Sequence, residues 1–489
     1  MTTINVRHPD QLFIDGRWVA PQRGGHIEVI SPSTEQVIAS VAEASAEDVD
    51  VAVRAARRAF DSGVWSNLDV SKRSEVIARI GVELEKRSAE LAAAWTQQVG
   101  ALATGAPFMV GAALFVTKFY AGLDAKKYLV EEVKPTDGRG TAIIAREPAG
   151  VVAAIAPWNA PLIILINKVI PALLAGCTVI MKPAPEAPLE GYLIAEAAEA
   201  AGLPAGVLNL VTAHREASEA LVRHPEVDKV SFTGSTGAGK RIASLCGERI
   251  ARCTLELGGK SAAVVCEDYD IAKAAKQLAA TITLSSGQVC ATLSRVLVPR
   301  HLQSQYAEAI AAELRAVKVG DPLDPTSQMG PLSMERQLHR VVGYMEKGRA
   351  EGAQLVCGGG RSQHMDKGFY FDPTLFTNVK SDMTIAQEEI FGPVIALMGY
   401  DDDAEAVRIA NDSPFGLFGA VFTADTDRAY RIARGIRTGA LGHNDFRMDF
   451  FLPFGGFKQS GIGREGGVSG LLGYTETKTI LLDAAPSAL

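Results

Sequence analysis

The sequence predicts an α/β protein with more than one domain, built on parallel sheets. Its 489 residues exceed what one ordinary hydrophobic core accommodates. Short apolar strands alternate with helices from Gly150 onward, and the alternation begins again at Ala262. Hydrophobic residues make up 47% of the chain and charged residues 21%, which is typical of a folded globular protein. We therefore expect two α/β units whose sheets are covered by helices on both faces.

The N-terminal part contains short strands followed by helices. Residues 12–19 form two short apolar runs around Asp15-Gly16, which predicts a hairpin with a two-residue turn. A helix is expected over 46–60, with Ser45 as its N-cap. Apolar residues spaced by three and four predict one further helix over 72–95.

Five apolar strands are predicted between Gly150 and Gly259. They cover residues 151–156, 178–182, 207–211, 229–232 and 253–257. A helix over about 189–201 is stopped by Gly202-Leu203-Pro204, and another begins after Gly234. Strands joined in this way predict a doubly wound, Rossmann-like dinucleotide domain, whose ligands lie at the C-terminal ends of the strands.

A second alternation follows in the other half of the chain. It comprises a strand over 262–266, a helix over 271–284, a strand over 295–298, a helix over 302–317 and further units to about Leu441. The two halves meet at Glu256-Leu257-Gly258-Gly259. Clefts tend to form where domains meet, so a substrate site is expected at this junction.

Composition argues against several classes of protein. The formal net charge of -7, without a basic run, argues against nucleic acid or an anionic membrane as the main partner. The apolar stretch 151–181 is interrupted by prolines, asparagines and a lysine, so a buried strand, loop and helix fit it better than a membrane span. Residues 1–10 lack the apolar core of a signal peptide. Six scattered cysteines form no C-x-x-C pair, which favours a reducing cytoplasm and no metal site.

The glycine-rich turn from Gly234 to Lys240 nearly matches the phosphate loop of NTPases. The residue after Lys240 is Arg241, so the hydroxyl that would hold magnesium is missing. A glycine turn at a helix N-terminus still offers backbone N–H groups to phosphate, and a dinucleotide pyrophosphate satisfies it as well as ATP does. A plain turn is the remaining alternative.

Three residues are candidates for catalysis. Cys290 lies in the small-residue loop Ser286-Gly287-Gln288-Val289-Cys290, where a thiol can be a nucleophile, although a core cysteine is the alternative. Glu256 ends a buried strand, and burial can make it a base near neutral pH unless it pairs with Lys260. Asn159 follows Pro157-Trp158 after the first strand, and it is either an oxyanion donor or a turn residue.

Two C-terminal segments are weaker candidates. An acid and an aromatic ring precede a Gly-Pro turn in the segment Glu389-Ile390-Phe391-Gly392-Pro393-Val394. The acid is suited to bind a ribose and the ring to pack on a flat cofactor. The alternative is a plain loop edge. His443 has no second metal ligand near it in the sequence, and a hydrogen-bonded histidine is the better interpretation.

Taken together, these segments resemble the aldehyde dehydrogenase superfamily over nearly the whole chain. The matching stretches, in order, are Pro157-Trp158-Asn159, Lys182-Pro183, Phe232-Thr233-Gly234-Ser235-Thr236, Leu255-Glu256-Leu257-Gly258-Gly259-Lys260, Gly287-Gln288-x-Cys290, Glu389-Ile390-Phe391-Gly392-Pro393-Val394 and Pro453-Phe454-Gly455-Gly456-x-Lys458-x-Ser460-Gly461. Each is modest alone, and their order and separations make the resemblance specific.

The resemblance implies a role for each matching residue. Cys290 would be the nucleophile, Glu256 the general base, and Asn159 the oxyanion donor together with the Cys290 backbone N–H. The cofactor would be NAD, with NADP possible. The residues implied to bind it are Pro157, Trp158, Lys182, Gly234, Ser235, Glu389 and Phe391.

The resemblance also implies an organisation and an assembly. Residues 1–125 and 148–257 would form the NAD(P)-binding domain, and 258–445 the catalytic domain. Residues 126–147 and 470–489 would form a small oligomerisation element of β-strands, as expected for a homodimer or homotetramer.

The chain departs from the family pattern near the cofactor and the substrate. Pro185 and then Glu186 stand where a glutamate often follows the ribose lysine by three residues, which leaves NAD and NADP both open. Ala213 and Arg215 replace a common pair of glycines. Ala160 replaces an aromatic residue, and Ser285 replaces an asparagine.

The resemblance implies oxidation of an aldehyde to an acid through a thioester on Cys290, which water activated by Glu256 hydrolyses. The segment 446–452 carries three aromatic residues and Ala160 is small, so we expect a bulky apolar aldehyde, aromatic or terpenoid. The alternatives are a semialdehyde whose carboxylate pairs with Arg447, and a non-catalytic relative that keeps the fold.

Overall fold

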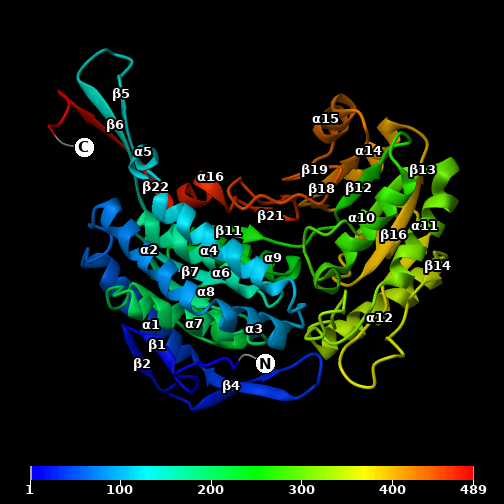
Figure 1. Cartoon of the computed structure of the whole chain (residues 1–489). Coiled ribbons are helices and arrows are strands. Elements are labelled where there is room, and N and C mark those ends of the chain that lie inside the picture. Colours follow the sequence, from blue (N-terminus) through cyan, green and yellow to red (C-terminus); the bar gives the residue numbers. More distant parts are fainter. Residues whose placement is uncertain (1–2, 488–489) are drawn as a thin grey trace.

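The computed structural model describes residues 3–487 of the chain. Two α/β halves lie side by side, and a small sheet of three strands projects from the first half (Figure 1). Met1 and Thr2, part of the segment predicted not to be a signal peptide, lie outside the described residues. So do Ala488 and Leu489 of the predicted oligomerisation element.

The first half is organised around an eight-stranded sheet in the order β2-β1-β9-β8-β7-β10-β11-β21. Its five central strands are parallel, and antiparallel strands close both edges. The strands are β1 (Leu12–Ile14), β2 (Arg17–Val19), β7 (Val151–Ile155), β8 (Thr178–Lys182), β9 (Leu208–Leu210), β10 (Lys229–Thr233), β11 (Arg252–Glu256) and β21 (Gly461–Ile462). This is the predicted doubly wound arrangement, so the C-terminal ends of the parallel strands share one edge.

Helices cover both faces of this sheet. They are α1 (Ala46–Asp61), α2 (Val70–Lys86), α3 (Ser88–Val99), α4 (Ala106–Gly122), α6 (Pro161–Ala175), α7 (Leu189–Ala200), α8 (Arg215–Arg223) and α9 (Thr236–Glu248), while β3 (Gly25–Ile30) and β4 (Val37–Glu43) form a separate hairpin. Ser45 caps α1 in a capping box with Asp48, as its position predicted. Asp15 and Gly16 have φ of 55° and 70°, which is the turn predicted for the β1–β2 hairpin.

The apolar stretch 151–181 is a buried strand, loop and helix, as predicted: it forms β7, α6 and most of β8. Pro161 begins α6, and Gly176 ends it in the left-handed conformation, with φ of 98°. Across residues 3–487, no helix has both the length and the apolar character needed to cross a membrane.

The single helix predicted over 72–95 is wrong, because the structure has α2 and α3 with a break at Arg87. Arg87 has φ of −104° and ψ of 12°, outside the helical region. Its guanidinium donates to Glu90 Oε1 at 2.5 Å and to Glu196 Oε2 of α7 at 2.8 Å. The apolar spacing continues across the break because both helices pack on the same core, so the sequence pattern gave no sign of it. The ends of the other predicted helices and strands differ from the observed ones by no more than one residue.

The second half contains a seven-stranded sheet in the order β14-β15-β16-β13-β12-β18-β19, parallel except for β14. Its strands are β12 (Ala262–Val265), β13 (Arg295–Pro299), β14 (Gln354–Cys357), β15 (Thr374–Thr377), β16 (Val394–Tyr400), β18 (Gly419–Phe422) and β19 (Gly442–His443). Its helices are α10 (Ile271–Thr283), α11 (Gln303–Ala316), α12 (Glu335–Ala350), α13 (Thr384–Gln387), α14 (Asp403–Asn411) and α15 (Thr426–Gly435), with 3-10 turns η1 (Leu284–Gly287) and η2 (Arg300–Leu302). A short pair, β17 (Phe415–Gly416) and β20 (Phe457–Lys458), completes it.

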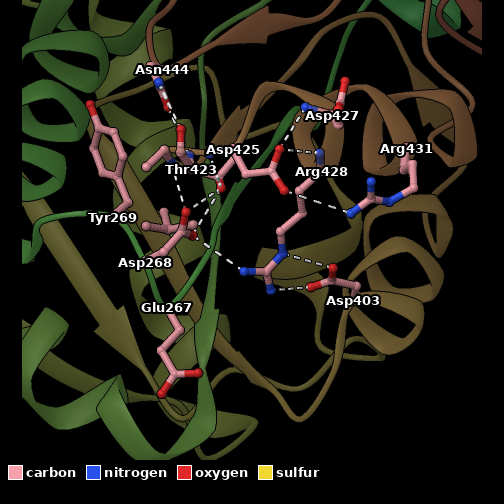
Figure 2. Close-up of polar contacts among 12 residues, drawn as sticks. Glu267, Asp268, Tyr269, Asp403, Thr423, Asp425, Asp427, Arg428, Arg431 and Asn444 are labelled. Atoms are coloured by element: carbon pink, nitrogen blue, oxygen red, sulfur yellow. Dashed lines mark hydrogen bonds and ion pairs between the residues drawn. The ribbon is translucent and has the colours of Figure 1, made fainter.

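A polar network joins the segments that follow β12 and β18 of this second sheet (Figure 2). Asp268, just after β12, accepts from Thr423 Oγ1 at 2.7 Å and pairs with Arg428 of α15 at 3.3 Å. Arg428 also pairs with Asp403 of α14 at 2.6 Å. Asn444 Nδ2 donates to the Thr423 carbonyl at 2.9 Å. The network therefore anchors the segment that leads into residues 446–452.

The projecting sheet has the order β22-β6-β5 and is antiparallel. Its strands are β5 (Val130–Val133), β6 (Thr141–Pro148) and β22 (Thr475–Leu482), flanked by α5 (Lys126–Leu129) and α16 (Gly467–Leu472). The segments predicted to form a separate β-element do come together, and the C-terminus lies there (Figure 1). Its role in assembly stays a prediction.

Candidate active site

The predicted site residues come from both halves and meet at the edge where the parallel strands of the first sheet end. Asn159 follows β7, Lys182 ends β8, and Glu256 ends β11. Gly234 follows β10, and its backbone N–H donates to the Glu256 carbonyl at 3.0 Å. Cys290 reaches this edge from the second half, in the loop after α10 and η1.

The loop that carries Cys290 is held in an unusual backbone conformation. Ser285, Ser286 and Gly287 have φ of 46°, 56° and 72°, all in the left-handed region. Ser286 Oγ donates to the carbonyl of Gly330 at 2.8 Å. Gln288 Oε1 accepts from the backbone N–H of Ser333 at 2.9 Å. These contacts offset the cost of the left-handed conformation and fix the direction in which Cys290 points.

Asn159 contacts the Cys290 loop directly. Its Nδ2 donates to the Gln288 carbonyl at 2.9 Å, two residues before the thiol. Its own carbonyl accepts from Trp95 Nε1 at 2.9 Å, and only 9% of the residue is exposed. The amide group is therefore fixed beside Cys290, where a side-chain N–H can stabilise negative charge on a substrate oxygen.

The electrostatic surroundings of Cys290 keep its thiol protonated at rest. Burial raises the thiol pKa to about 12, and the carboxyl groups of Glu389 and Glu256 contribute to the increase. The backbone N–H groups of Cys290 and Ala291 act in the opposite direction. Forming the reactive thiolate therefore requires a nearby proton acceptor.

Glu256 is a buried carboxyl group that is available for chemistry. It is 4% exposed, and within residues 3–487 neither of its carboxylate oxygens has a hydrogen-bond partner. Burial raises its pKa well above 4.5, and the negative charge of Glu465 adds to the increase, while Lys168 and Arg464 oppose it. A Cβ on Gly455 would lie 2.6 Å from Glu256 Oε1, so the chain approaches this carboxylate as only glycine allows. Such an acid is suited to accept a proton near neutral pH.

The alternative pairing of Glu256 with Lys260 is not what the structure has. Among the described residues, Lys260 Nζ has no hydrogen-bond partner. Burial lowers the pKa of its ammonium to about 7, and the carboxyl groups that oppose this change are Glu389 and Glu388. Lys260 therefore faces the Glu389 turn, while Glu256 stays free of a hydrogen bond.

A buried ion pair behind Glu256 has no counterpart in the sequence analysis. Lys168 of α6 is fully buried, and its Nζ lies 2.5 Å from Glu465 Oε1. It also donates to Ser231 Oγ at 3.2 Å, and Tyr474 Oη donates to the same oxygen at 3.0 Å. Lys168 stood out in the sequence only as a charge in an apolar stretch, and nothing there indicated its partner 297 residues away.

Replacing Lys168 with methionine should destabilise the protein strongly. The change leaves Glu465 buried without its cation, which typically costs about 3–5 kcal/mol of the free energy of unfolding. The midpoint of denaturant unfolding measures the effect. Lys72→Met is the control, because Lys72 forms an exposed pair with Glu75 that contributes less than about 1 kcal/mol. Equal midpoints for the two variants would contradict the importance of the buried pair.

The turn of Glu389 and Phe391 lies against the loop that carries Cys290, where a Cβ on Gly287 would clash with the Gly392 carbonyl oxygen. Glu389 Oε1 accepts from the Gly259 backbone N–H at 3.1 Å, and burial raises the pKa of this carboxyl to about 7. Phe391 has a left-handed φ of 63°, and its ring meets Trp158 edge-on at 5.4 Å. Gln337 of α12 holds the turn by donating to the Phe391 carbonyl at 2.7 Å. The predicted residues Trp158, Glu389 and Phe391 are thus brought together.

The glycine turn after β10 has the features of a phosphate-binding turn. The Ser235 side chain caps α9 by accepting from the Ala238 N–H at 3.3 Å, and the N-terminus of this 13-residue helix leaves further N–H groups for a ligand. The hydroxyl oxygens of Thr233 and Thr236, on either side of Gly234 and Ser235, are buried and lack a hydrogen-bond partner among residues 3–487.

Lys182 is the last residue of β8, at the same edge of the sheet as this turn, with β7 between β8 and β10. It is 6% exposed, and burial lowers the pKa of its ammonium to about 8. The residues that would complete an NTPase phosphate loop do not gather here: Lys240 is exposed, and Arg241 pairs with Glu219 at 2.8 Å. The orphaned hydroxyls, the helix N-terminus and Lys182 fit a dinucleotide pyrophosphate and ribose better than ATP with magnesium.

Two residues weighed in the sequence lie outside this cluster. His443 Nε2 lies 3.1 Å from the Thr423 carbonyl oxygen. This residue is therefore hydrogen-bonded, as its sequence context predicted. Arg447 is exposed. No group of three or more potential metal-binding side chains is found within residues 3–487.

Comparison with known proteins identifies the family. The sequence profile described as "Aldehyde dehydrogenase family" matches residues 18–480. The chain is 41% identical over 481 residues to geranial dehydrogenase of Castellaniella defragrans, covering 98% of this chain and 99% of that protein. It is 40% identical over 484 residues to 3-succinoylsemialdehyde-pyridine dehydrogenase of a Pseudomonas species, covering 97% of this chain and 99% of that protein.

A solved structure agrees with the sequence relatives. The crystal structure of a mutant of aldehyde dehydrogenase C from Pseudomonas syringae, in complex with NAD+ and octanal, superposes with a TM-score of 0.95 at 40% identity and covers 100% of both chains. The fold, the order of the motifs and these relatives lead to one conclusion: the chain belongs to the aldehyde dehydrogenase family.

Proposed function

We propose that this NAD-dependent aldehyde dehydrogenase oxidises a bulky apolar aldehyde through a thioester on Cys290, which water activated by Glu256 hydrolyses. The observation that carries the proposal is the convergence of a thiol, a side-chain amide and a free buried carboxyl group at one edge. These are the nucleophile, oxyanion donor and base that acyl chemistry needs. A non-catalytic relative would not be expected to retain all three.

The residues around the strand ends are suited to hold NAD+. Lys182 would contact the adenosine ribose, and the turn of Gly234 and Ser235 would hold the pyrophosphate, with the unpartnered hydroxyls of Thr233 and Thr236 beside it. The nicotinamide half would be held by Glu389 and Phe391, with Pro157 and Trp158 facing them. The bound cofactor supplies the two-electron oxidant of the reaction.

The chain's own residues would carry the first half of the reaction. The Cys290 sulfur adds to the aldehyde carbonyl, and the thiol proton passes to a carboxyl group. Glu256 and Glu389 are the two carboxyl groups whose charges act on this thiol. The carbonyl oxygen becomes an oxyanion, which Asn159 Nδ2 and the Cys290 backbone N–H stabilise. Asn159 donates to the Gln288 carbonyl in this structure, so it would exchange that acceptor for the oxyanion.

Glu256 would carry the second half. After oxidation, the acyl group remains on the Cys290 sulfur as a thioester. Because its pKa is raised, the Glu256 carboxylate binds protons more strongly than an exposed glutamate does. Any proton that Glu256 received from the thiol first leaves to solvent, and the carboxylate then takes a proton from water as that water attacks the thioester carbonyl. The carbon–sulfur bond then breaks, the acid leaves, and the thiol is restored.

The segment 446–452, which we call the substrate loop, supports an apolar substrate. Phe446 and Met448 pack against the core cluster that also contacts Cys290. Phe450 and Phe451 pack against the cluster of the first half that contacts Ala160. Apolar side chains of the loop therefore pack against the cores of both halves.

Aromatic residues of α4 continue this apolar surface outward. Phe451 meets Phe115 edge-on at 4.8 Å and Phe119 at 5.0 Å. Phe115 and Leu452 are each 59% exposed, which is unusual for large apolar side chains that serve only the core. The geranial dehydrogenase and the octanal complex among the relatives support an apolar aldehyde.

The alternative is a semialdehyde whose distal carboxylate pairs with Arg447. The semialdehyde named for the second relative favours it. Arg447 itself is exposed. Exposed ion pairs contribute little binding energy, which makes this alternative the weaker one.

A panel of aldehydes with two variants separates these substrates. Cofactor reduction is followed by absorbance with citral, benzaldehyde, hexanal and succinic semialdehyde, each with NAD+ and with NADP+. We expect kcat/KM to be highest for citral or benzaldehyde, and Phe451→Ala to lower it about 10-fold to 100-fold by removing one aromatic contact. Arg447→Gln is the control and should leave these values unchanged. A preference for succinic semialdehyde that Arg447→Gln abolishes would establish the alternative.

The organisation and assembly predicted from the sequence are also proposed. We propose NAD(P)-binding residues 1–125 with 148–257, catalytic residues 258–445, and assembly into a homodimer or homotetramer through 126–147 and 470–489. Exposed Leu481 and Ile480 on β22 support a contact surface on the projecting sheet. The cytoplasm stays the predicted location, and the six cysteines are free thiols in the structure.

A further inference from the structure

Two cysteines outside the candidate active site lie next to each other in the first half. Cys246 is in the last turn of α9, and Cys253 is the second residue of β11. Side chains alternate along a strand, so Cys253 and Leu255 share one face of the sheet. Both pack in the core cluster that contains Cys246, on the face that α9 covers. The two thiols interact there through a side-chain hydrogen bond.

A short exposed turn joins the two cysteines, which are seven positions apart in the sequence. The backbone N–H groups of Arg249 and Ala251 both donate to the Cys246 carbonyl, at 3.2 and 2.9 Å, where α9 ends. Ile250, in the middle of the turn, is 79% exposed. An S–S bond is about 2 Å long, so the sulfurs must approach each other more closely than in a hydrogen bond. Movement of this exposed turn allows that approach without disturbing the core.

The two thiols differ in their contact with solvent. Cys246 is 1% exposed, whereas Cys253 is half-buried near the start of its strand. Both are free thiols. A dissolved oxidant therefore reaches Cys253 first, and Cys246 is the neighbour that can react with the oxidised sulfur.

The surroundings of Cys253 favour its thiolate, which is the reactive form of a cysteine. The hydrogen bond from the Cys246 thiol lowers the pKa of Cys253 to about 7; burial opposes this change, and the charge of Lys229 adds to it. The same hydrogen bond raises the pKa of Cys246. Cys290, whose pKa burial raises to about 12, stays protonated under the same conditions. Cys253 is therefore the thiol that a mild oxidant attacks more readily.

We propose that Cys246 and Cys253 form a redox-active pair, which a hydroperoxide oxidises to a disulfide within one chain. The Cys253 sulfur attacks the peroxide, the O–O bond breaks, and the thiol proton leaves with the departing oxygen as an alcohol, or as water from hydrogen peroxide. Cys253 is then a sulfenic acid. The Cys246 sulfur attacks the Cys253 sulfur, the S–O bond breaks, and water leaves with the second thiol proton. The two thiols together lose two hydrogen atoms, and the hydroperoxide is reduced.

Simple packing of two core cysteines is the competing explanation, because a free cysteine is often only a small buried residue. Under that explanation, peroxide would leave the buried Cys246 as a thiol. In the predicted cytoplasm thiols are kept reduced, and a disulfide there is usually transient and redox-sensing. A link that peroxide forms and a dithiol reverses is therefore the property that only the proposed role provides.

The test is mass spectrometry of the full chain after treatment with hydrogen peroxide, with the remaining thiols alkylated before digestion. Trypsin cleaves after Arg249 and Arg252, so the disulfide would join two separate peptides, 242–249 and 253–260. We expect this linked pair from most molecules of treated wild-type protein, and its disappearance after dithiothreitol. The pair should form equally in Cys290→Ala, because it needs no other cysteine. Recovery of both peptides with alkylated thiols after peroxide treatment would overturn the proposal.

Single variants establish the order of the two steps. Cys246→Ala should stop at the sulfenic acid of Cys253, which dimedone labels. Cys253→Ala should leave Cys246 a thiol, oxidised at least about tenfold more slowly than Cys253 is in wild-type protein. Cys357→Ala, which removes another buried free thiol, is the matched control and should form the linked pair like wild type. A sulfenic acid on Cys253 that persists in wild-type protein, or a disulfide that joins two chains, would contradict the assignment of Cys246 as its partner.

Discussion

Replacing Cys290 with alanine should abolish aldehyde oxidation, lowering kcat by at least about 10^4-fold. The thiol is the group that would form the covalent adduct, and the buried carboxyls and the Asn159 amide act on that adduct alone. Without the sulfur no adduct forms, so the carboxyl groups and the Asn159 amide have no reacting group to act on. The measurement is cofactor reduction with the best aldehyde of the panel, together with mass spectrometry for the acyl adduct, which should disappear.

A second cysteine shows whether the loss is specific. Cys253 is also a free, half-buried thiol, and it lies in β11 three residues before Glu256. Cys253→Ala should retain full activity. Cys290→Ala should still bind NADH like wild type, because Lys182 and the turn after β10 are unchanged. Substantial turnover by Cys290→Ala would disprove the thioester mechanism and leave the family and fold as they are.

Replacing Glu256 with glutamine should stop the reaction after the thioester has formed. Glutamine keeps the size of the side chain and cannot accept a proton, so loss of the general base should slow hydrolysis by about 10²-fold to 10⁴-fold. Rapid mixing should show a burst of cofactor reduction equal to the enzyme concentration, followed by a slow steady state. Steady turnover at the wild-type rate would show that another group activates the water.

The pH dependence of the steady state should change with the same variant. The Glu256 pKa is raised because burial and the nearby Glu465 disfavour its charged form, so the carboxylate appears only as the pH rises well above 4.5. Thioester hydrolysis by wild-type enzyme should therefore increase with pH until Glu256 is ionised. The residual rate of Glu256→Gln should lack this increase.

A buried glutamate away from the site provides the control for burial alone. Burial raises the pKa of Glu190 in α7 to about 8, and Gln98 hydrogen-bonds its carboxylate. Glu190→Gln should keep the wild-type time course of cofactor reduction, without the burst of Glu256→Gln, and the wild-type pH profile of hydrolysis. A burst in this variant would mean that the effect of Glu256→Gln reflects the general loss of a buried carboxyl group.

Local features of the fold could be predicted because each depends on neighbours in the sequence. The capping box of Ser45 and Asp48 spans three residues, and the turn of Asp15 and Gly16 needs only residues that tolerate positive φ. The parallel strands were recognisable because both faces are buried, which makes them continuously apolar. The break at Arg87 was missed because its cause is partly Glu196, on another helix.

The sequence by itself determined the family, the two α/β halves and the identity of the candidate residues, because fixed motifs in a fixed order survive without knowledge of distances. The tertiary structure alone decided their surroundings. It left Glu256 without Lys260, the alternative partner, and placed the pair of Lys168 and Glu465 behind it. It also joined Arg336 to Glu186 across the two halves. A sequence states which charges exist, but pKa values and ion pairs depend on burial and on separations of a few ångströms, which only the packed chain fixes.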